Sequence, residues 1–302
     1  MTRHQTDEIR VTVRPGRPGD RGRILGLLDQ ARHQVVGFGP EDLAQMLSDH
    51  DHLTLIADTG ALLWGFVIAS LLHQPVHLGE TEEPWAQLRG CALLNGWQVD
   101  NGVQTLWEPL RALLRARGLR HVLHLGATDW IVGPLQRAGF HITDSLVTLE
   151  RGVGIERAGE GQGPARLRGP RTGDIDGLLA LDTLAFEPPW RLTRSDLIGF
   201  MLTGGHFVVA ELDGRPMGYA FSDVHLEVGQ LARLAVHPAR QRQGIGSQLL
   251  TDSLAFCRRA GARTFTLNTQ ESNAASRLLY ARHGLRVVGG RTPVMEYRIV
   301  RS

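Results

Sequence analysis

The sequence repeats itself once along its length, and this repeat limits the fold more than any other feature. Residues 11–14 form an alternating segment that leads through a polar turn into an apolar-periodic segment, and residues 166–168 begin the same pattern again. Each copy is typical of a short strand, a turn and a helix. Asp20 and Asp174 stand where an aspartate would cap the helix.

The two halves also end alike. Residues 118–125 and 261–268 each start at a glycine and continue as an alternating strand. Residues 135–140 and 280–285 are each a helix end followed by glycine. Matches separated by about half the chain indicate a duplicated domain rather than a solenoid of short repeats.

The segment between the halves differs in composition from both of them. Residues 152–163 are rich in Gly and Glu and have no apolar periodicity, which is typical of a linker. We therefore predict a first domain over residues 1–150, a linker over 151–165 and a second domain over 166–302. A chain of 302 residues is long enough for two domains with separate cores.

Charge and cysteine content exclude several classes of protein. A net charge of +2 gives no field that would attract nucleic acid. No apolar run is long enough to span a membrane, and the N-terminus has no signal-peptide pattern. Only Cys91 and Cys257 are present, which suits two buried thiols in a reducing cytoplasm. His50, Asp51 and His52 are adjacent in the sequence, and no further ligand stands at a spacing typical of metal sites, so we predict no metal site.

The second half can be divided into finer elements. Helices and strands alternate there, which indicates an α/β sheet with helices on both faces. The turn between the first two of its longer strands is Asp213-Gly214. We expect strands over residues 206–212, 216–224, 231–236, 265–269 and 294–300. We expect one helix that begins near residue 194 and two more over residues 245–260 and 274–283.

The strongest chemical signal follows the strand at Leu234-Ala235-Val236. The strand stops at a proline, makes a basic turn with two glycines, Gly244 and Gly246, and enters an amphipathic helix. Glycines let consecutive backbone N–H groups approach a diphosphate, and a helix N-terminus adds partial positive charge. The pattern is that of an anion site, although it is neither a Walker loop nor a Rossmann fingerprint.

This segment resembles the acetyl-CoA loop of the GNAT superfamily, Gln/Arg-x-x-Gly-x-Gly/Ala, with matches at Gln241, Gly244 and Gly246. The resemblance implies two tandem GNAT domains, each an α/β domain with a mixed, mostly antiparallel sheet flanked by helices. It implies acetyl-CoA as co-substrate, with its pyrophosphate held by the backbone of residues 242–247 and its pantetheine arm paired with residues 234–236. The implied cofactor-binding residues are Leu234, Ala235, Val236, Gln241, Arg242, Gln243, Gly244, Ile245, Gly246, Ser247 and Asn273.

The downstream segment also resembles the family, where a strand, an asparagine and a tyrosine-bearing helix follow one another. In that resemblance Asn273 lies along the pantetheine, and Tyr280 protonates the departing CoA thiolate. A phenol with a pKa near 10 is protonated at neutral pH and can donate. Asn273 is equally suited to capping the helix, and Tyr280 to filling the core.

The general base is left open. The segment is most similar to protein N-terminal alanine acetyltransferases, in which an acidic residue on the strand accepts the amine proton, but here Asn268 stands at that position. The remaining candidates are a water chain or one of four polar residues: Asp223, His225, Glu227 and Glu271.

An aromatic and proline-rich segment lies between the first two helices of the second half. Phe186-Glu187-Pro188-Pro189-Trp190 resembles the Phe-x-x-Trp feature of the same acetyltransferases, and the superfamily lines its acceptor mouth with this segment. We predict that Trp190 contacts the acceptor and that Glu187 holds a protonated amine, while a Trp that closes the core is the alternative.

The first half carries a degraded copy of these motifs. Gly102 alone aligns with the loop glycines, Gln104 replaces the second one, Asp100 adds negative charge, and Leu135 replaces the tyrosine. This half also holds five of the six Trp. We expect it to be structural or to contribute to acceptor recognition.

Together these features favour an acetyl-CoA-dependent N-acetyltransferase that moves an acetyl group to a primary amine by direct attack in a ternary complex. The acceptor is a protein N-terminus or a small molecule. One alternative is a non-catalytic acyl-CoA-binding or regulatory module. A second is an enzyme of the mycothiol-synthase type, which the tandem layout resembles. No nucleic acid, membrane or metal is expected, and a homodimer is compatible with the sequence.

Overall fold

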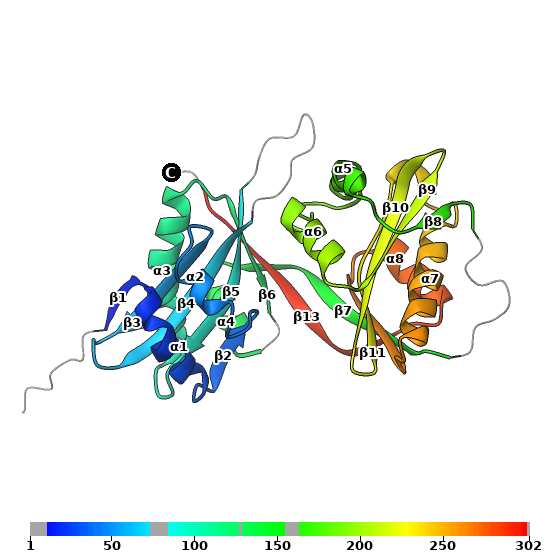
Figure 1. Cartoon of the computed structure of the whole chain (residues 1–302). Coiled ribbons are helices and arrows are strands. Elements are labelled where there is room, and N and C mark those ends of the chain that lie inside the picture. Colours follow the sequence, from blue (N-terminus) through cyan, green and yellow to red (C-terminus); the bar gives the residue numbers. More distant parts are fainter. Residues whose placement is uncertain (1–10, 73–83, 127–128, 155–162, 301–302) are drawn as a thin grey trace, which may run out of the picture. The chain divides into compact units, whose positions relative to one another are not determined.

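The computed structural model describes residues 11–72, 84–126, 129–154 and 163–300. They form two compact units, of which the first contains residues 11–72, 84–143 and 292–300 and the second residues 144–291, apart from the gaps just given. Each is an α/β unit with a mostly antiparallel sheet, as expected (Figure 1). The predicted domain boundaries stay a prediction, and most of the predicted linker lies outside the described residues.

The first unit has its helices on both faces of the sheet. Its strands follow the order β1-β3-β4-β5-β6-β13, in which β13 is Arg286–Arg298, and β2 pairs with β5 off this path. Helices α1 and α2 cover one face and α3 and α4 the other, each over its own apolar cluster. The elements are β1 (Thr12–Pro15), α1 (Arg21–Leu28), β2 (His33–Val36), α2 (Leu43–Met46), β3 (His52–Asp58), β4 (Leu63–Leu72), β5 (Trp85–Leu93), α3 (Val99–Ala116), β6 (His121–Leu125) and α4 (Asp129–Arg137).

The second unit repeats this plan. Its strand order is β7-β12-β11-β10-β9-β8, with α5 and α6 on one face and α7 and α8 on the other (Figure 1). The elements are β8 (Arg166–Arg168), α5 (Ile175–Ala185), α6 (Arg194–Leu202), β9 (His206–Leu212), β10 (Arg215–His225), β11 (Val228–Val236), α7 (Ile245–Arg259), β12 (Thr264–Gln270) and α8 (Ala274–Arg282).

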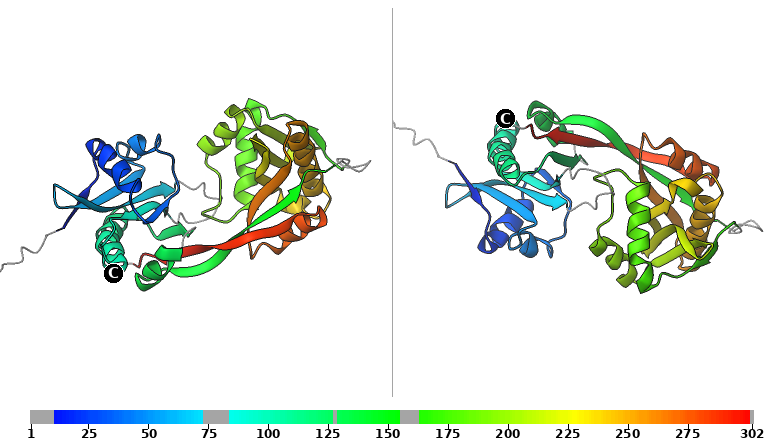
Figure 2. Two further views of the ribbon diagram at one scale, coloured as in Figure 1. Left: turned by 90° about the horizontal axis from the view of Figure 1, so that it is seen from below. Right: turned by 90° about the horizontal axis from the view of Figure 1, so that it is seen from above.

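The predicted elements of the second half are confirmed to within a few residues, with one difference. The last strand was expected over residues 294–300 as the completion of the second half. Strand β13 (Arg286–Arg298) instead begins in the second unit and pairs with β6 of the first through Val294–Arg298. Strand β7 (His141–Gly152) runs the opposite way, beginning in the first unit and pairing with β12 of the second. The two long strands lie side by side (Figure 2).

Both thiols are buried and free, as predicted. Burial raises the pKa of Cys91 and of Cys257 to about 12, because the low-dielectric core disfavours the thiolate. None of the described helices combines the length and the apolarity that a membrane span requires.

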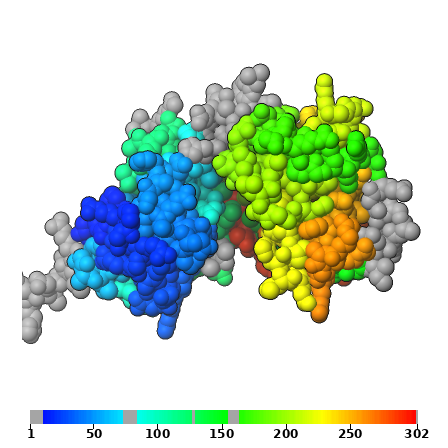
Figure 3. Space-filling model, in the orientation of Figure 1, coloured from blue at the N-terminus to red at the C-terminus, as the bar shows by residue number. Residues whose placement is uncertain are grey.

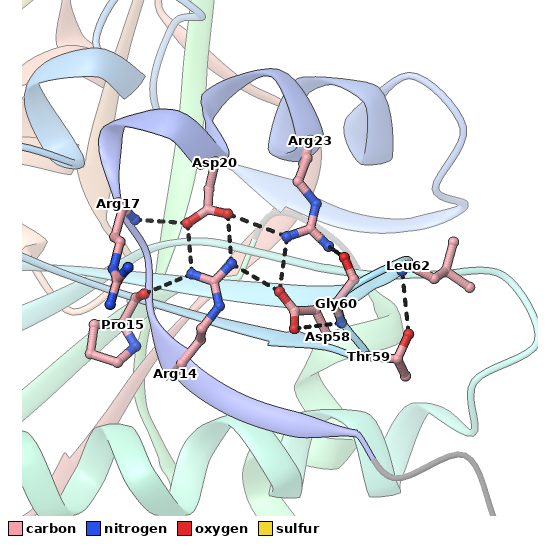
Figure 4. Close-up of polar contacts among 9 residues, drawn as sticks. All are labelled: Arg14, Pro15, Arg17, Asp20, Arg23, Asp58, Thr59, Gly60 and Leu62. Carbon is pink, nitrogen blue, oxygen red and sulfur yellow. Dashed lines mark hydrogen bonds and ion pairs between the residues drawn. The ribbon is translucent and has the colours of Figure 1, made fainter. Parts of the chain in front are cut away.

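The duplication is visible in one polar network that recurs at the start of each unit. In the first unit Arg14 binds both carboxylate oxygens of Asp20 at 2.8 Å, and Asp58 accepts from Arg14 and Arg23 at 3.0 and 2.9 Å (Figure 4). In the second unit Arg168 binds Asp174 at 2.6 and 2.9 Å. The two aspartates are 154 residues apart in the sequence, as are the two arginines.

Both aspartates stand at the N-cap position of the following helix, as expected, but their side chains do not cap it. Neither side chain bonds to the first turn of its helix. Asp20 instead accepts from the main-chain amide of Arg17 at 2.9 Å, and Asp174 from that of Arg171 at 2.7 Å. The reason is tertiary, because the arginine on the preceding strand offers two charged donors that a helix N-terminus lacks.

Loss of the Asp20 carboxylate should destabilise the first unit. Hydrogen bonds from Arg14 lower the pKa of Asp20 from 3.8 to about 2, so the pair contributes roughly 2 kcal/mol to folding at neutral pH. This contribution is present above pH 3.8 and is lost as the pH falls through the folded pKa near 2. We expect Asp20→Asn to lower the free energy of unfolding by that amount at pH 7, and the difference from wild type to vanish near pH 2.

The measurement is urea denaturation followed by tryptophan fluorescence at several pH values, because most of the Trp lie in the first half. The exposed Asp29 in the same unit supplies the control Asp29→Asn. A pH-independent gap between wild type and Asp20→Asn would contradict the assignment.

Candidate active site

One edge of β11 is open where the strand approaches the glycine-rich turn. β11 runs parallel to β12 only over Val228–Leu231, and it stays antiparallel to β10 as far as Val236. Ala232 is skipped in the pairing with β10, so the strand bulges there. Beyond the bulge, no described strand pairs with β11 on the side of β12. An extended ligand that carries amide groups can pair with such an edge.

The turn that follows presents a row of unbonded main-chain amides. A short 3₁₀ turn, Pro238–Arg240, is followed by exposed residues 241–244 and the start of α7. Within the described chain, the amides of residues 242–247 have no backbone acceptor. Arg242 has φ 61° and Gly244 φ 90°, a left-handed conformation that is costly for a non-glycine residue. With the α7 dipole and the charges of Arg240 and Arg242, this turn can hold a diphosphate.

Side chains fix the shape of the turn. The Gln241 amide donates to the Val236 carbonyl at 3.2 Å, and the Gln243 amide donates to the Ala239 carbonyl at 3.3 Å. Gly246 lies in the first turn of α7, where a Cβ would stand 3.3 Å from Leu279 Cδ2. The Ser247 hydroxyl bonds to His283 Nε2 at 2.6 Å, so the Ser247 side chain is engaged within the protein while its amide is not.

Helix α8 therefore packs against the start of α7, and it carries the predicted acid. Tyr280 is 6% exposed and belongs to the same apolar cluster as Val236 and Ile245. Burial raises the pKa of Tyr280 to about 12, against opposing contributions from Ser276 and Arg233. The phenol is thus protonated at neutral pH. Asn273 caps α8, because its Oδ1 accepts from the Ser276 amide at 3.1 Å.

The expected acceptor residues lie on the loop between α5 and α6. Figure 3 shows the surfaces of these two helices in green on the second unit. Trp190 is half-buried and Glu187 is exposed, and the Trp190 amide donates to the Glu187 carbonyl at 2.9 Å. Trp190 is therefore not sealed in the core, and both side chains are accessible to a ligand.

Sequence reasoning missed a buried ion pair beneath this loop. Asp182 on α5 is fully buried and binds Arg233 on β11 at 2.6–2.9 Å. Tyr219 donates its hydroxyl proton to the same carboxylate at 2.5 Å. The available signal was one charged residue in each of two otherwise apolar segments, Leu181-Asp182 and Arg233-Leu234, since buried charges require partners.

None of the four polar residues considered as the base stands beside the open edge as a free group. Glu227 immediately precedes β11, seven residues before Leu234, which is about 20 Å along a strand. His225 ends β10 and pairs with Val228 at that same end of β11, and Asp223 lies two residues earlier on β10, 3.3 Å from His225. Glu271 is paired with Arg291 at 2.7 Å, which lowers the pKa of this carboxylate. Asn268 on β12 is exposed and accepts from Thr148 at 2.8 Å.

In the first unit the two corresponding strands also separate after a few paired residues, but another strand of the same unit occupies the edge that this separation leaves. β5 runs parallel to β6 only over Trp85–Leu88, and Arg89 is skipped in its pairing with β4, as Ala232 is in β11. Beyond this bulge, β2 pairs antiparallel with Gly90–Leu93 of β5. The Trp130 indole donates to the Gln34 carbonyl of β2 at 3.1 Å. The edge that is open in the second unit is therefore occupied in the first.

The turn before α3 is filled as well. It spans only residues 94–98, whereas the turn before α7 spans residues 237–244. A Cβ at Gly102 would lie 3.2 Å from the Trp97 ring, so the indole covers the start of the helix. Asp100 is ion-paired with Arg137. Leu135, at the place of the tyrosine, is buried in the core.

Comparison with known proteins also distinguishes the two halves of the chain, because the family match lies in the second half. The acetyltransferase (GNAT) family matches residues 175–285. A putative ribosomal protein bS18-alanine N-acetyltransferase from Bacillus subtilis is 27% identical over 127 residues, which are 41% of this chain and 83% of that protein. An uncharacterized N-acetyltransferase from Methanocaldococcus jannaschii is 31% identical over 115 residues, which are 37% of this chain and 72% of that protein.

Solved structures share the whole architecture. A tandem GNAT protein from the clavulanic acid biosynthesis pathway superposes with a TM-score of 0.66 at 13% identity and covers 97% of this chain and all of its own. At that identity the likeness concerns the fold alone, and the fold is two GNAT domains in tandem.

Proposed function

The chain belongs to the GNAT family of acetyltransferases, and from this premise we propose that its second unit transfers an acetyl group from acetyl-CoA to a primary amine. The observation that carries the proposal is the open edge of β11, followed directly by the unbonded amides of residues 242–247. A strand edge suits the amide-bearing pantetheine arm, and the row of amides suits the pyrophosphate. The two features adjoin in the order in which these parts of CoA are joined.

Each of the predicted cofactor residues has a place in this arrangement. Leu234, Ala235 and Val236 offer the strand edge, and Gln241 and Gln243 brace the turn through their side chains. Arg242, Gly244, Ile245, Gly246 and Ser247 contribute main-chain amides. Asn273 sets the start of α8, and in this way it fixes the direction of the helix that carries Tyr280.

The reaction is a direct transfer within a ternary complex. The neutral amine attacks the thioester carbonyl carbon, a C–N bond forms, and the C–S bond breaks. The sulfur leaves with the electron pair and receives the Tyr280 hydroxyl proton, the nitrogen loses a proton to water, and water returns a proton to the Tyr280 phenolate. Tyr280 suits the first of these proton transfers because its phenol stays protonated over the physiological pH range.

The acceptor approaches over the loop that contains Glu187 and Trp190. The Bacillus subtilis relative is named for acetylation of the alanine of a ribosomal protein, so a protein N-terminus is the first acceptor to test, followed by small-molecule amines. Glu187 would face the ammonium group, and Trp190 would contact the adjoining part of the acceptor.

A non-catalytic acyl-CoA-binding module is the second candidate. One observation favours it: Asn268 stands where related enzymes carry an acid, and the four other candidate bases are distant or ion-paired. In such a module acetyl-CoA would bind without turnover.

Calorimetry and a free-thiol assay distinguish these functions. We expect one acetyl-CoA per chain, because β2 and Trp97 close the corresponding opening of the first unit. We also expect CoA release that depends on an amine or peptide acceptor. Binding without acceptor-dependent thiol release would favour the module, and absence of binding would refute both. A stoichiometry of two would contradict the closure of the first unit.

A further inference from the structure

The Asp182–Arg233 pair holds both ends of the acceptor loop. At the end of the loop, the Leu192 amide donates to Asp182 Oδ1 at 2.8 Å. At its beginning, the Phe186 ring lies under the Arg233 guanidinium, 3.4 Å from Cζ to the ring centroid. Arg191 closes the loop on itself, because its Nε donates to the Phe186 carbonyl at 3.0 Å.

The same arginine belongs to the strand with the open edge. Arg233 directly precedes Leu234 in β11, and its side chain is only 13% exposed. Its charge also acts on Tyr280, whose pKa it lowers against the larger effect of burial. Arg233 thus connects three parts of the proposed site: the loop, the strand and the acid.

The described part of the first unit has no equivalent pair. Asp174 corresponds to Asp20 at a spacing of 154 residues, which places Leu28 at the position of Asp182. The bulges at Ala232 and Arg89 align Arg233 with Gly90, where a Cβ would lie 2.6 Å from the Phe38 ring. The Arg168–Asp174 pair, by contrast, recurs in both units. Both pairs of the second unit are buried, but only Arg168–Asp174 has a counterpart at the corresponding described positions of the first unit, so the Asp182–Arg233 pair accompanies the open edge.

Stability alone does not account for a buried pair of this kind. Removing two charges from water costs about as much as their attraction returns, and apolar residues of similar size often stabilise a protein as well. Buried ionic groups are better explained where they impose one geometry. Arginine suits that role because its planar fork fixes a carboxylate and its face stacks on an aromatic ring.

We propose that Arg233, held by Asp182, is a positioning residue that fixes the Phe186–Trp190 segment over the open edge of β11 and so sets the affinity for the amine acceptor. The inference rests on the proposed function. It assigns no chemical step to Arg233, since the guanidinium is occupied by Asp182 and Phe186.

The test compares two pairs of neutralising substitutions. The double variant Asp182→Asn/Arg233→Gln removes the ion pair without leaving one buried charge alone. The control, Arg168→Gln/Asp174→Asn, removes the recurring pair, in which Arg168 lies on β8 and also binds Glu211 of β9 at 2.6 Å. We expect the first variant to raise KM for the amine at least tenfold while the Kd for acetyl-CoA changes less than twofold. The control should change neither constant, although it lowers the melting temperature.

The single variant Arg233→Lys keeps the charge but loses the fork and the stacking face. We expect it to lie between wild type and the double variant in KM, with kcat changed less than KM. An unchanged KM in both variants would overturn the inference, and so would an equal weakening of acetyl-CoA binding.

A second readout is independent of turnover. Trp190 is the only tryptophan after residue 130, and its fluorescence is obtained as the difference from the same protein with Trp190→Phe. Acrylamide should quench Trp190 more strongly in Asp182→Asn/Arg233→Gln than in wild type or the control. If wild type failed to bind acetyl-CoA, the proposed function would fall, while this quenching would still show whether the pair anchors the loop.

Discussion

Tyr280→Phe is expected to lower kcat about 10²–10³-fold while changing the Kd for acetyl-CoA less than twofold. The phenyl ring fills the same space in the core between α7 and α8, so the fold is retained and only the proton donor is lost. Without that proton the sulfur must leave as a thiolate. Steady-state kinetics with a saturating acceptor, together with calorimetry, gives both constants.

The control is the same substitution at another of the three tyrosines of the chain. Tyr297 lies in the first unit, where its hydroxyl accepts from Arg111 at 3.4 Å, so Tyr297→Phe removes a phenol that does not belong to the unit with the open edge. This variant should keep wild-type kcat. If Tyr280→Phe left kcat intact, or weakened acetyl-CoA binding as much as it slowed turnover, Tyr280 would be a core residue only.

The basic limb of the pH profile offers a further check on the same residue. Because the pKa of Tyr280 is about 12, the phenol should not lose its proton within the range in which the protein is usually assayed. A fall in kcat between pH 8 and 10 in wild type that disappears in Tyr280→Phe would contradict the raised pKa.

Gly246→Asp is expected to weaken acetyl-CoA binding at least a hundredfold. The new side chain would start 3.3 Å from Leu279 in the first turn of α7, where the turn presents its unbonded amides. A carboxylate there would compete with the pyrophosphate for the same donors and repel it. Calorimetry on the folded variant measures the loss, and circular dichroism checks the fold.

Gly246→Ala separates the methyl group from the charge. A Cβ at 3.3 Å requires Leu279 to shift by a few tenths of an ångström, so we expect a loss of affinity of less than tenfold. If the aspartate variant bound acetyl-CoA as well as the alanine variant does, the turn would not be the diphosphate site.

The sequence predicted best those features that depend on neighbouring residues. The strand His206–Leu212 was predicted with its exact bounds, and α7 and α8 to within one residue, because apolar periodicity and flanking glycines act locally. The turn at Asp213-Gly214 has positive φ at both residues, as its composition indicates. The duplication was also evident, since both copies kept the same strand, turn and helix.

The sequence predicted least well the pairing of distant segments. The last strand was predicted over residues 294–300, yet β13 begins at Arg286, continues through Gly289-Gly290 and ends beside β6. Asp20 and Asp174 stand at the expected N-cap positions, but their side chains bind arginines on the preceding strands instead of the helix. In both cases the partner is selected by the folded backbone and not by the local residue pattern.

The sequence by itself determined that this protein has two copies of one α/β design and that the second copy has the glycines and the tyrosine of an acetyltransferase. Those properties reside in side-chain type and spacing along a continuous stretch of chain. Only the tertiary structure decided that β2 closes the opening of the first unit and that Asp182 meets Arg233 beneath the acceptor loop. Every residue type offers nearly the same main-chain donors and acceptors, so the sequence does not indicate which strands will pair. A charged residue that will be buried needs a partner, but its own position in the sequence does not indicate which residue that is.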